Sequence, residues 1–418
     1  MTGREANFKT LSEVGSIGRG KSKHRPRNDP RLYGGQHPFV QTSDVKHAGL
    51  HLTNYSQTYS DLGLEQSKLW PAETLCITIA ANIGDTAILG IPACFPDSIL
   101  GFVADPDASN VRYVKYCLDG FKEQIQLISR GTTQDNLSLD KLLKLRFWFP
   151  NVQVQEQIAA ILSAYDDRIA NNQRRIALLE FMAEEIYREW FVRMRVPGHD
   201  KVSKLKGIPS TWKIARIGEI FQTTSGGTPS RGKAENFDGD IPWVKTGELK
   251  SLFVHETEER LTQRGIDSSA ARVLPRHTVV MAMYCAMPDV TLLGVPAATN
   301  QACCALLPRE GYLGHTYCYY FAKYALSQMV GFAHGAAQQN LSQEIIRKFQ
   351  VLHPDPALIS LYSERTSALF GLAETLMRVN SELERTRDAL LPRLISGKLK
   401  VDHLDIQLPP AMREKVTA

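Results

Sequence analysis

The segment from Gly15 to Ser22 has the residue types and spacing of a loop that holds phosphate. It matches the pattern G-x-x-x-x-G-K-S, in which backbone N–H groups and a lysine surround the phosphates of a nucleotide. Such a loop needs a strand before it and a helix after it. Pro26 and Pro30 oppose a helix in the residues that follow. The sequence therefore favours a flexible, glycine-rich basic loop over a nucleotide site.

Basic side chains are concentrated around this segment. Between Gly15 and Arg31 there are six basic residues against one acid, Asp29. Such a cluster can hold phosphates although the formal net charge of the whole chain is only +5, and an arginine or lysine can also read guanine in the major groove. The alternative is a solvated basic loop without a ligand. The candidate DNA contacts here are Arg19, Lys21, Ser22, Lys23, Arg25 and Arg27.

Two further kinds of polar segment each occur twice. Residues 42–44 and 246–248 follow short predicted strands, and we expect Asp44 and Glu248 to accept backbone N–H groups within turns. Residues 131–138 and 335–342 each carry a glutamine amide that can pair with adenine, followed by an asparagine that is expected to cap a helix. The expected caps are Asn136 and Asn340, and the candidate DNA contacts are Thr42, Lys245, Thr246, Thr132, Thr133, Gln134 and Gln338.

The sequence offers no pattern for catalysis by this chain. It contains no Asn-Pro-Pro-aromatic motif of a DNA methyltransferase, and no glycine-rich segment follows an opening strand to hold S-adenosylmethionine. The seven cysteines form no Cys-x-x-Cys pair and most lie in apolar surroundings, so we expect buried free thiols of a reducing compartment. We therefore expect no catalytic residue, no metal site and no cofactor on this chain.

One pattern occurs twice, 204 positions apart. His37-Pro38-Phe39-Val40 returns as Ile241-Pro242-Trp243-Val244, and residues 131–138 return as residues 335–342. The offsets agree, since 241 − 37 = 204 and 335 − 131 = 204, so the register is kept over about a hundred residues. A period this long indicates a duplicated domain, which suits a target with two comparable half-sites.

Each copy begins with short apolar runs that are broken by turn residues, which is typical of a mixed α/β domain with an irregular sheet. The expected strands include Thr74–Ile79, Thr86–Leu89, Thr278–Met283 and Val290–Val295. Helices are expected at Asn110–Ile128 and Gly314–Gly331.

Each copy ends in a long helix. Apolar residues in steps of four and three run from Ile158 to Trp190 and from Tyr362 to Leu390, which predicts heptad seams on helices roughly 50 to 60 Å long. We expect the two helices to pair antiparallel and to separate the two domains; the alternative is that each packs onto its own domain. The expected packing residues are Leu162, Tyr165, Ile169, Ile176, Leu179, Leu369, Leu372, Leu376, Val379 and Leu383.

Asn172 interrupts the first seam. If it is buried, it costs stability but can fix the register between the helices. It can equally lie at the edge of the seam and face water.

The bulk composition is that of a soluble globular protein. The 418 residues are 43% hydrophobic and 22% charged, which predicts two or three domains. Asp85 and Asp289 interrupt the longest apolar stretches, so these stretches indicate core strands rather than membrane spans. We expect a cytoplasmic protein.

Taken in order, the motifs resemble those of the DNA-specificity subunit of type I restriction–modification systems over nearly the whole chain. The second copy runs from Ile208-Pro209-Ser210-Thr211-Trp212 through Gly226-Gly227-Thr228-Pro229-Ser230. The helices close with Tyr187-Arg188-Glu189-Trp190-Phe191 and with Leu390-Leu391-Pro392-Arg393-Leu394. The first copy departs from this pattern, because Gly18-Arg19-Gly20-Lys21-Ser22 replaces the Gly-Gly-Thr-Pro-Ser segment.

The resemblance implies an α+β, mixed α/β fold with two similar target-recognition domains, separated by two antiparallel coiled-coil helices and related by a pseudo-two-fold repeat. The implied parts are residues 1–150 and 203–354 as recognition domains, 151–202 and 355–400 as spacer helices, and 401–418 as a tail. Further DNA contacts are expected in the second domain at Thr223, Ser225, Thr228, Ser230 and Arg231.

The implied function is recognition of an asymmetric bipartite site in double-stranded DNA without catalysis by this chain. The implied partners are two methyltransferase subunits and restriction/translocase subunits, which would carry S-adenosylmethionine, ATP and Mg. Two alternatives remain at this point: a stand-alone nuclease or NTPase that uses residues 15–22, and an interaction scaffold whose domains no longer bind DNA.

Overall fold

The computed structural model describes residues 7–129, 139–198, 203–205, 207–283, 289–309, 313–334 and 341–409. The chain divides into two compact units. The first unit comprises residues 1–172 with 379–418, and the second comprises residues 173–378. Each of the two long helices therefore contributes a segment to both units.

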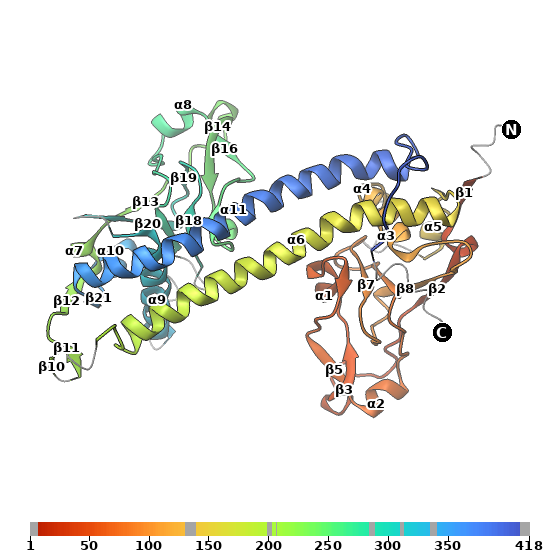
Figure 1. Ribbon diagram of the computed structural model, residues 1–418, viewed down its shortest axis with the longest axis horizontal. Helices are drawn as coiled ribbons and strands as arrows, with labels where there is room; N and C mark the ends of the chain where they lie inside the picture. Colours follow the sequence, from red (N-terminus) through yellow and green to blue (C-terminus); the bar gives the residue numbers. More distant parts are fainter. Residues whose placement is uncertain are drawn as a thin grey trace. The chain divides into compact units, whose positions relative to one another are not determined.

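The first unit contains nine strands and the shorter helices α1 to α5 among its described residues (Figure 1). The strands are β1 (Phe8–Lys9), β2 (Gly15–Arg19), β3 (Tyr33–Phe39), β4 (His51–Leu52), β5 (Gln57–Tyr59), β6 (Leu75–Thr78), β7 (Thr86–Leu89), β8 (Ile99–Ala104) and β9 (Phe147–Trp148). The helices are α1 (Thr42–His47), α2 (Asp61–Glu65), α3 (Val111–Gly120), α4 (Lys122–Ser129) and α5 (Leu139–Leu143).

The second unit repeats this set of elements. Its strands are β10 (Lys204–Leu205), β11 (Ile208–Pro209), β12 (Lys213–Arg216), β13 (Phe221–Ser225), β14 (Phe237–Val244), β15 (Phe253–Val254), β16 (Arg260–Leu261), β17 (Val279–Ala282), β18 (Val290–Leu293), β19 (Ala298–Thr299), β20 (Cys303–Pro308) and β21 (Gln350–His353). Its shorter helices are α7 (Ile217–Ile220), α8 (Gln263–Asp267), α9 (His315–His334) and α10 (Gln343–Lys348).

The central sheets of the two units have the same topology. The first is β2-β8-β6-β7-β4 and the second is β13-β20-β17-β18-β15. In each sheet the middle strand, β6 or β17, is antiparallel to both of its neighbours, and the edge strand β4 or β15 is parallel to its neighbour. β6 and β17 begin 204 positions apart, since 279 − 75 = 204. The predicted duplication is thus visible as a repeated sheet.

Alternating side chains of the central strands supply cores on both faces of the sheet, as the two-residue period of a strand requires. Leu75 and Ile77 pack with Tyr113 of α3 in one cluster, whereas Cys76 packs with Trp70 and Phe95 in another. This explains why the predicted core segments read as continuous apolar runs. Six cysteines are free and buried within the described residues, and burial raises the pKa of the thiols of Cys117, Cys303, Cys304 and Cys318 to about 12.

The expected long helices are present as α6 (Val152–Tyr187) and α11 (Pro356–Ile395) (Figure 1). A π-helical turn, Arg188–Val192, continues α6. One prediction about the shorter helices differs in detail: the stretch 110–128 forms two helices, α3 and α4, because the backbone changes direction at Phe121. No helix in the described part of the chain is both long and apolar enough to cross a membrane.

Within the first unit, the start of α6 packs against the end of α11. Ile158 and Leu162 of α6 share a core with Leu394 and Ile395 of α11. Asp166 pairs with Arg387, and Asn172 pairs with Asn380, so the residue numbers rise on one helix as they fall on the other. The two helices therefore run antiparallel in this unit, and they also pack onto the domain.

Within the second unit, the end of α6 enters an aromatic core. Tyr187, Trp190 and Phe191 contact the ring of Tyr362 near the start of α11, and Tyr187 also contacts Tyr320 of α9. The hydroxyl of Tyr362 donates to the carbonyl oxygen of Ala183 at 3.0 Å. Both alternatives for the helices thus hold together, because each helix pairs with the other and also packs onto a domain.

The seam on α11 differs from the predicted one. Leu372 and Val379 are exposed, at 41% and 39%, whereas Phe370, Ala373 and Asn380 are buried. The prediction was wrong at Leu372 and Val379 because it chose seam positions by apolar residue type. The buried position next to Val379 is instead occupied by a polar residue, Asn380. Leu162, Ile169 and Leu376 are buried as expected, and Tyr165, Ile176, Leu179, Leu369 and Leu383 are half-buried. Asn172 is fully buried, which decides between its two interpretations.

A cluster of ionisable groups fixes α11 to the second domain. Glu374 of α11 accepts hydrogen bonds from Arg276 at 2.7 Å and from His255 at 3.2 Å. Burial acts to raise the pKa of Glu374, but these hydrogen bonds outweigh it, so the pKa lies below its ordinary value. The rings of His277 and His315 stack beside this carboxylate at 4.3 Å between centroids. Burial lowers the pKa of His277, and it lowers the pKa of His315 to about 4.

This cluster predicts that the second unit loses stability in mild acid. His277 and His315 are neutral in the folded protein, and their folded pKa values lie below the unfolded value of 6.5. Their contribution is therefore complete above about pH 6.5 and declines as the pH falls. For His315, whose folded pKa is about 4, the contribution is lost as the pH falls toward 4 and amounts to roughly 3 kcal/mol at most. His315→Phe should flatten the fall in melting temperature between pH 7 and pH 5, whereas His403→Phe, at an exposed position, should leave it unchanged. Parallel pH profiles for all three proteins would contradict the assignment.

Candidate nucleic-acid interface

The glycine-rich segment of the first unit is a strand followed by an anchored loop. Residues 15–19 form β2, which pairs along its whole length with β8. The N–H of Gly20 then donates to the carbonyl oxygen of Ile99 at 2.9 Å, and a β-carbon at Gly20 would collide with the carbonyl oxygen of Phe95. Only a short 3-10 turn follows, at Pro30–Leu32. This segment therefore lacks the strand, loop and helix geometry of a nucleotide site, as the two prolines predicted.

The loop backbone is held against the domain on both sides. The N–H of Lys21 donates to Phe95 at 3.1 Å, and its carbonyl oxygen accepts from the hydroxyl of Ser67 at 2.8 Å. The N–H of His24 donates to the side chain of Gln66 at 3.0 Å. The expectation of a flexible loop was therefore wrong. Ser22 is 9% exposed, so its side chain is largely buried in the protein, and its proposed DNA contact stays a prediction.

The basic side chains of this loop fall into two groups. Arg27 pairs with Asp97 at 3.0 Å and Arg31 pairs with Asp29 at 2.7 Å, and hydrogen bonds from Arg31 hold the pKa of Asp29 well below its usual range. Arg25 donates to two backbone carbonyl oxygens, of Ser22 and His24. The second group consists of exposed side chains that form no ion pair within the described residues: Arg19, Lys21 and Lys23.

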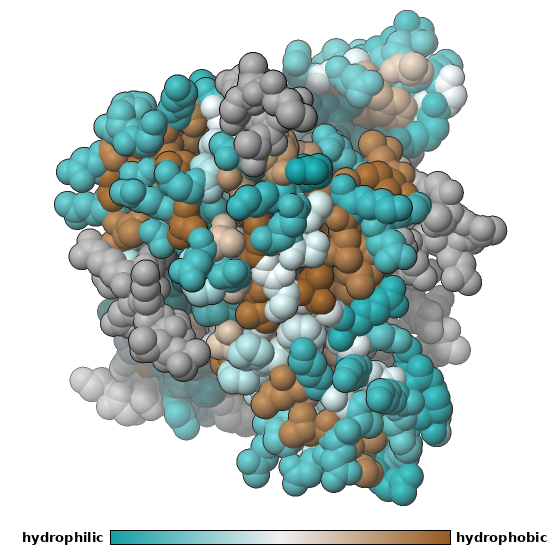
Figure 2. Space-filling model, turned by 90° about the vertical axis from the view of Figure 1, so that its right-hand side faces the viewer, coloured by the Kyte–Doolittle hydropathy of each residue, from teal (hydrophilic) through white to brown (hydrophobic). Residues whose placement is uncertain are grey.

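A cation from elsewhere in the chain lies next to this loop. The ammonium group of Lys68 lies 3.5 Å from the centre of the Trp70 ring, and the neighbouring Ser67 is bonded to the backbone of Lys21. Sequence reasoning missed Lys68, because it lies far from the basic run in the chain. We call Arg19, Lys21, Lys23 and Lys68 the basic loop surface. Figure 2 shows a face of the molecule on which hydrophilic side chains dominate and apolar side chains lie in separate groups.

Two cations in the corresponding region of the second unit are neutralised, whereas Lys233 is exposed and forms no ion pair within the described residues. Arg231 pairs with Glu259 at 2.5 Å and lies over the rings of Phe237 and Trp243. The ammonium group of Lys245 lies 2.9 Å from both Glu258 and Glu259. The hydrogen bonds that Lys245 donates to Glu258 and Glu259 raise the pKa of Lys245, and those that Glu259 accepts from Arg231 and Lys245 lower the pKa of Glu259. Both cations were predicted to contact DNA; carboxylates hold both in this structure, and their DNA contacts stay predictions.

The other predicted contacts of the second unit surround a loop that is fixed from within. The indole N–H of Trp243 donates to the carbonyl oxygen of Gly227 at 3.1 Å. Thr228 bonds to Gln301, and Thr223 accepts from Gln343 at 3.0 Å. Ser230 is exposed, while Ser225 and Thr246 are half-buried, as is Thr42 in the first unit. DNA contact by these residues stays a prediction, and Thr132, Thr133, Gln134 and Gln338, with the expected caps Asn136 and Asn340, lie outside the described residues.

The expected turn chemistry of the two acids is confirmed. Asp44 accepts from the N–H of Gln41 at 2.8 Å, and Glu248 accepts from the N–H of Lys245 at 2.7 Å. Each carboxylate therefore closes the first turn of a short helix.

The histidines give no sign of a metal site on one helix. His47 and His51 are four residues apart, but α1 ends at His47 and His51 lies in β4. Within the described residues no group of three histidine, cysteine, aspartate or glutamate side chains is placed to hold a metal ion.

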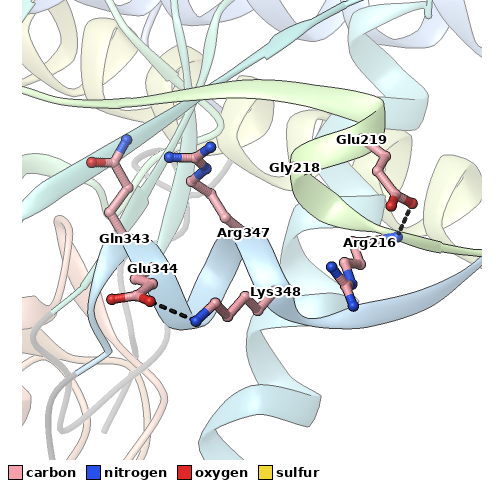
Figure 3. Close-up of a pocket in the computed structure, with 7 residues that line it drawn as sticks. All are labelled: Arg216, Gly218, Glu219, Gln343, Glu344, Arg347 and Lys348. Carbon is pink, nitrogen blue, oxygen red and sulfur yellow. Dashed lines mark hydrogen bonds and ion pairs between the residues drawn. The ribbon is translucent and has the colours of Figure 1, made fainter.

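The second unit also contains a cavity of about 570 Å³ between α7 and α10 (Figure 3). It is lined by Arg216, Gly218, Glu219, Gln343, Glu344, Arg347 and Lys348. Lys348 is paired with Glu344, and Glu219 accepts from the backbone of Arg216. Counting back 204 positions from Gln343 and Arg347 gives Leu139 and Leu143 in the first unit. The two units thus present different side chains on the same backbone.

Residues 4–180 and 209–357 match the model of the type I restriction modification DNA specificity domain. The chain belongs to this family. Its members include the type I restriction enzyme MjaIX specificity subunit of Methanocaldococcus jannaschii, which is 21% identical over 417 residues and matches 96% of this chain and 95% of that protein. The HindI specificity subunit of Haemophilus influenzae is 19% identical over 340 residues, covering 65% of this chain and 72% of that protein.

The fold of a specificity subunit is also recognisable. The S subunit of a type I restriction–modification system from M. genitalium superimposes with a TM-score of 0.58 and 16% identity, covering 93% of this chain and 95% of that one. The chain is therefore a type I specificity subunit, a component for DNA target recognition rather than for catalysis.

The two groups of cations in the first domain of this specificity subunit should differ in their effect on DNA binding. Lys21→Ala with Lys23→Ala removes unpaired charges, and should lower the slope of log affinity against log salt by about 2 if both contact phosphates. Arg31→Ala removes a cation that Asp29 already neutralises, and should change the slope by less than half as much. Binding of the assembled complex to duplex DNA at several salt concentrations measures both. If the double lysine variant and the Arg31 variant gave the same slope of log affinity against log salt, the basic loop surface would not contact DNA.

Proposed function

We propose that this specificity subunit reads an asymmetric, bipartite site in double-stranded DNA, one half with each recognition domain. The observation that carries the proposal is the repeated sheet with unlike surfaces. The basic loop surface of the first domain has unpaired cations, whereas Glu258 and Glu259 neutralise Lys245 and Arg231 in the second. Domains with the same backbone and different side chains suit two different half-sites.

The division of labour between affinity and specificity follows from these surfaces. Unpaired cations such as Lys21 and Lys23 attract any DNA sequence through its phosphates. A neutralised arginine such as Arg231 adds little of this general attraction, because Glu259 cancels its charge. We therefore propose that the first domain supplies more of the salt-dependent affinity and the second more of the direct reading by polar side chains.

The long helices are proposed to act as an antiparallel coiled-coil spacer between the half-sites. α6 has 36 residues and α11 has 40, and helices of this length measure about 54 and 60 Å at 1.5 Å per residue. Half-sites one helical turn of DNA apart are separated by about 34 Å, so the helices are long enough to set such a spacing.

The remaining parts of the complex are proposed from the family. Two methyltransferase subunits would bind along the helices, and restriction/translocase subunits would join that core in the cytoplasm. S-adenosylmethionine, ATP and Mg would bind on those partners and not on this chain. A nuclease or NTPase that uses residues 15–22 is not supported, because those residues form β2 and an anchored loop.

The test is base-resolution mapping of methylated adenines in cells that carry this chain with its methyltransferase and in cells that lack only this chain. We expect a gapped motif with two unlike halves that disappears when the chain is absent. An unchanged set of methylated sites would overturn the recognition function. A motif with two identical inverted halves would overturn the asymmetry alone.

A further inference from the structure

The seam between α6 and α11 in the first unit contains a charged network. The guanidinium group of Arg387 donates to one oxygen of Asp166 at 2.5 Å, and the hydroxyl of Tyr116 donates to the other oxygen at 2.5 Å. The side chains of Asp166 and Arg387 are only 13% and 27% exposed. Removing Arg387 would leave the largely buried carboxylate of Asp166 without a counter-charge, which is strongly unfavourable. Arg387 itself has a second partner, Asp388, at 2.9 Å.

Further along the same seam, two asparagines form a buried pair. The amide nitrogen of Asn172 donates to the side-chain oxygen of Asn380 at 2.8 Å, and the amide nitrogen of Asn380 donates to the carbonyl oxygen of Ile169 at 3.3 Å. Asn172 is fully buried and Asn380 is 7% exposed. A buried amide without a partner is costly, so each asparagine requires the other across the seam.

The internal repeat shows what the second unit has at the equivalent positions. The 204-residue offset relates Asp166 to Phe370, Arg387 to Ala183, Asn172 to Leu376 and Asn380 to Ile176. The first three of these counterparts are buried and Ile176 is half-buried. Every polar partner of the first seam is thus replaced by an apolar residue in the second. The two seams therefore lie at equivalent positions of the repeat, but the first has polar side chains at these positions and the second has apolar ones.

These differences penalise the pairing of like helices from two copies of the chain. If α6 paired with α6 of a second copy in the same antiparallel arrangement, Asp166 would face Ala183 and Asn172 would face Ile176. If α11 paired with α11, Arg387 would face Phe370 and Asn380 would face Leu376. Either arrangement buries charges and amides opposite apolar side chains, whereas α6 with α11 pairs Asp166 with Arg387 and Asn172 with Asn380.

The ends of the helices carry a second, independent difference. The second unit receives the aromatic end of α6, where the ring of Tyr187 stacks with Tyr324 at 5.3 Å between centroids. The first unit receives the aliphatic end of α11, with Leu394 and Ile395. Its counterpart of Tyr324 is Gly120 (324 − 204 = 120), where even a β-carbon would collide with Ile395. The core that closes over Ile395 is therefore shaped for the end of α11 and not for aromatic rings.

We propose that the Asp166–Arg387 and Asn172–Asn380 pairs, with the unlike helix ends, favour the pairing of α6 with α11 and disfavour the pairing of like helices from two copies of this chain. We call these four residues the key residues and this selective pairing keying. A complex then holds one copy of each recognition domain. This inference rests on the proposed function in one respect: two different recognition domains read an asymmetric site only if no complex contains the same domain twice.

The test replaces each key residue by its counterpart from the other unit. The seam-matched variant carries Asp166→Phe, Arg387→Ala, Asn172→Leu and Asn380→Ile in the full chain. Two differently tagged copies are co-expressed with the methyltransferase, and the fraction of one tag that co-purifies with the other is measured. We expect almost no cross-capture for the wild type and an increase of about tenfold or more for the variant. The control, Ile176→Leu with Leu376→Ile, keeps both keys and should behave as the wild type.

The methylated sites of the same cells separate this inference from the proposed function. The seam-matched variant should add gapped motifs with two identical inverted halves to the wild-type motif. A wild-type motif without any increase in cross-capture by the variant would overturn the keying and leave the proposed function intact. The absence of a wild-type motif would overturn the proposed function, while cross-capture would still test the keying.

Thermal melting of the purified complexes provides a second measurement if the seam-matched variant folds poorly. Asn172→Leu alone and Asn380→Ile alone should each lower the melting temperature, and the double variant should recover most of the loss, because the pair is then replaced as a whole. Independent, additive losses would show that the two asparagines are not coupled and would overturn their part in the key.

Discussion

Each long helix must bury an apolar stripe along its whole length, and this requirement organises the chain. Helix α6 begins in the core of the first unit, through Ile158 and Leu162, and ends in the aromatic core of the second, through Trp190 and Phe191. Helix α11 does the reverse. Neither unit has a complete core without a segment from the helix that belongs to the other repeat, so two domains that are separate in sequence are obliged to fold as parts of one molecule.

The two units share this fold, and their function depends on surface charges that can be replaced with little loss of stability. The sheets agree in strand order and in the register of their three middle strands. Yet the first unit leaves lysines of its basic loop without acidic partners, and the second pairs Lys245 and Arg231 with Glu258 and Glu259. Exposed ion pairs contribute little to stability. Surface charges can therefore diverge between the domains while the buried strands stay alike, which is the physical basis for one fold reading different sequences.

The sequence was informative where a structural feature leaves a local or periodic trace. The apolar runs around Leu75 and Val279 predicted the central strands, and the 204-residue offset predicted the repeated sheet. The seam of α11 was predicted less well, because Asn380 and Arg387 are polar residues at buried steps and their partners on α6 lie about 200 positions away. The same reason explains the errors at the basic loop. Nothing near Ser22 in the sequence shows that it is buried, and Asp97 and Lys68 reach that loop only through the fold.

The two units also differ in when their residues are made. The second unit is a continuous stretch, residues 173–378, whereas the first needs both ends of the chain. Leu394, Ile395 and Val401 are at most 5% exposed in the first core, and a ribosome adds them after every residue of the second unit. The apolar face of the first half of α6 therefore stays exposed until these residues are synthesised, whereas the second unit can complete its core earlier. The order of synthesis is the reverse of the order in which the cores close, and a chain that stopped short of α11's last turns would leave its earliest-made domain unfinished.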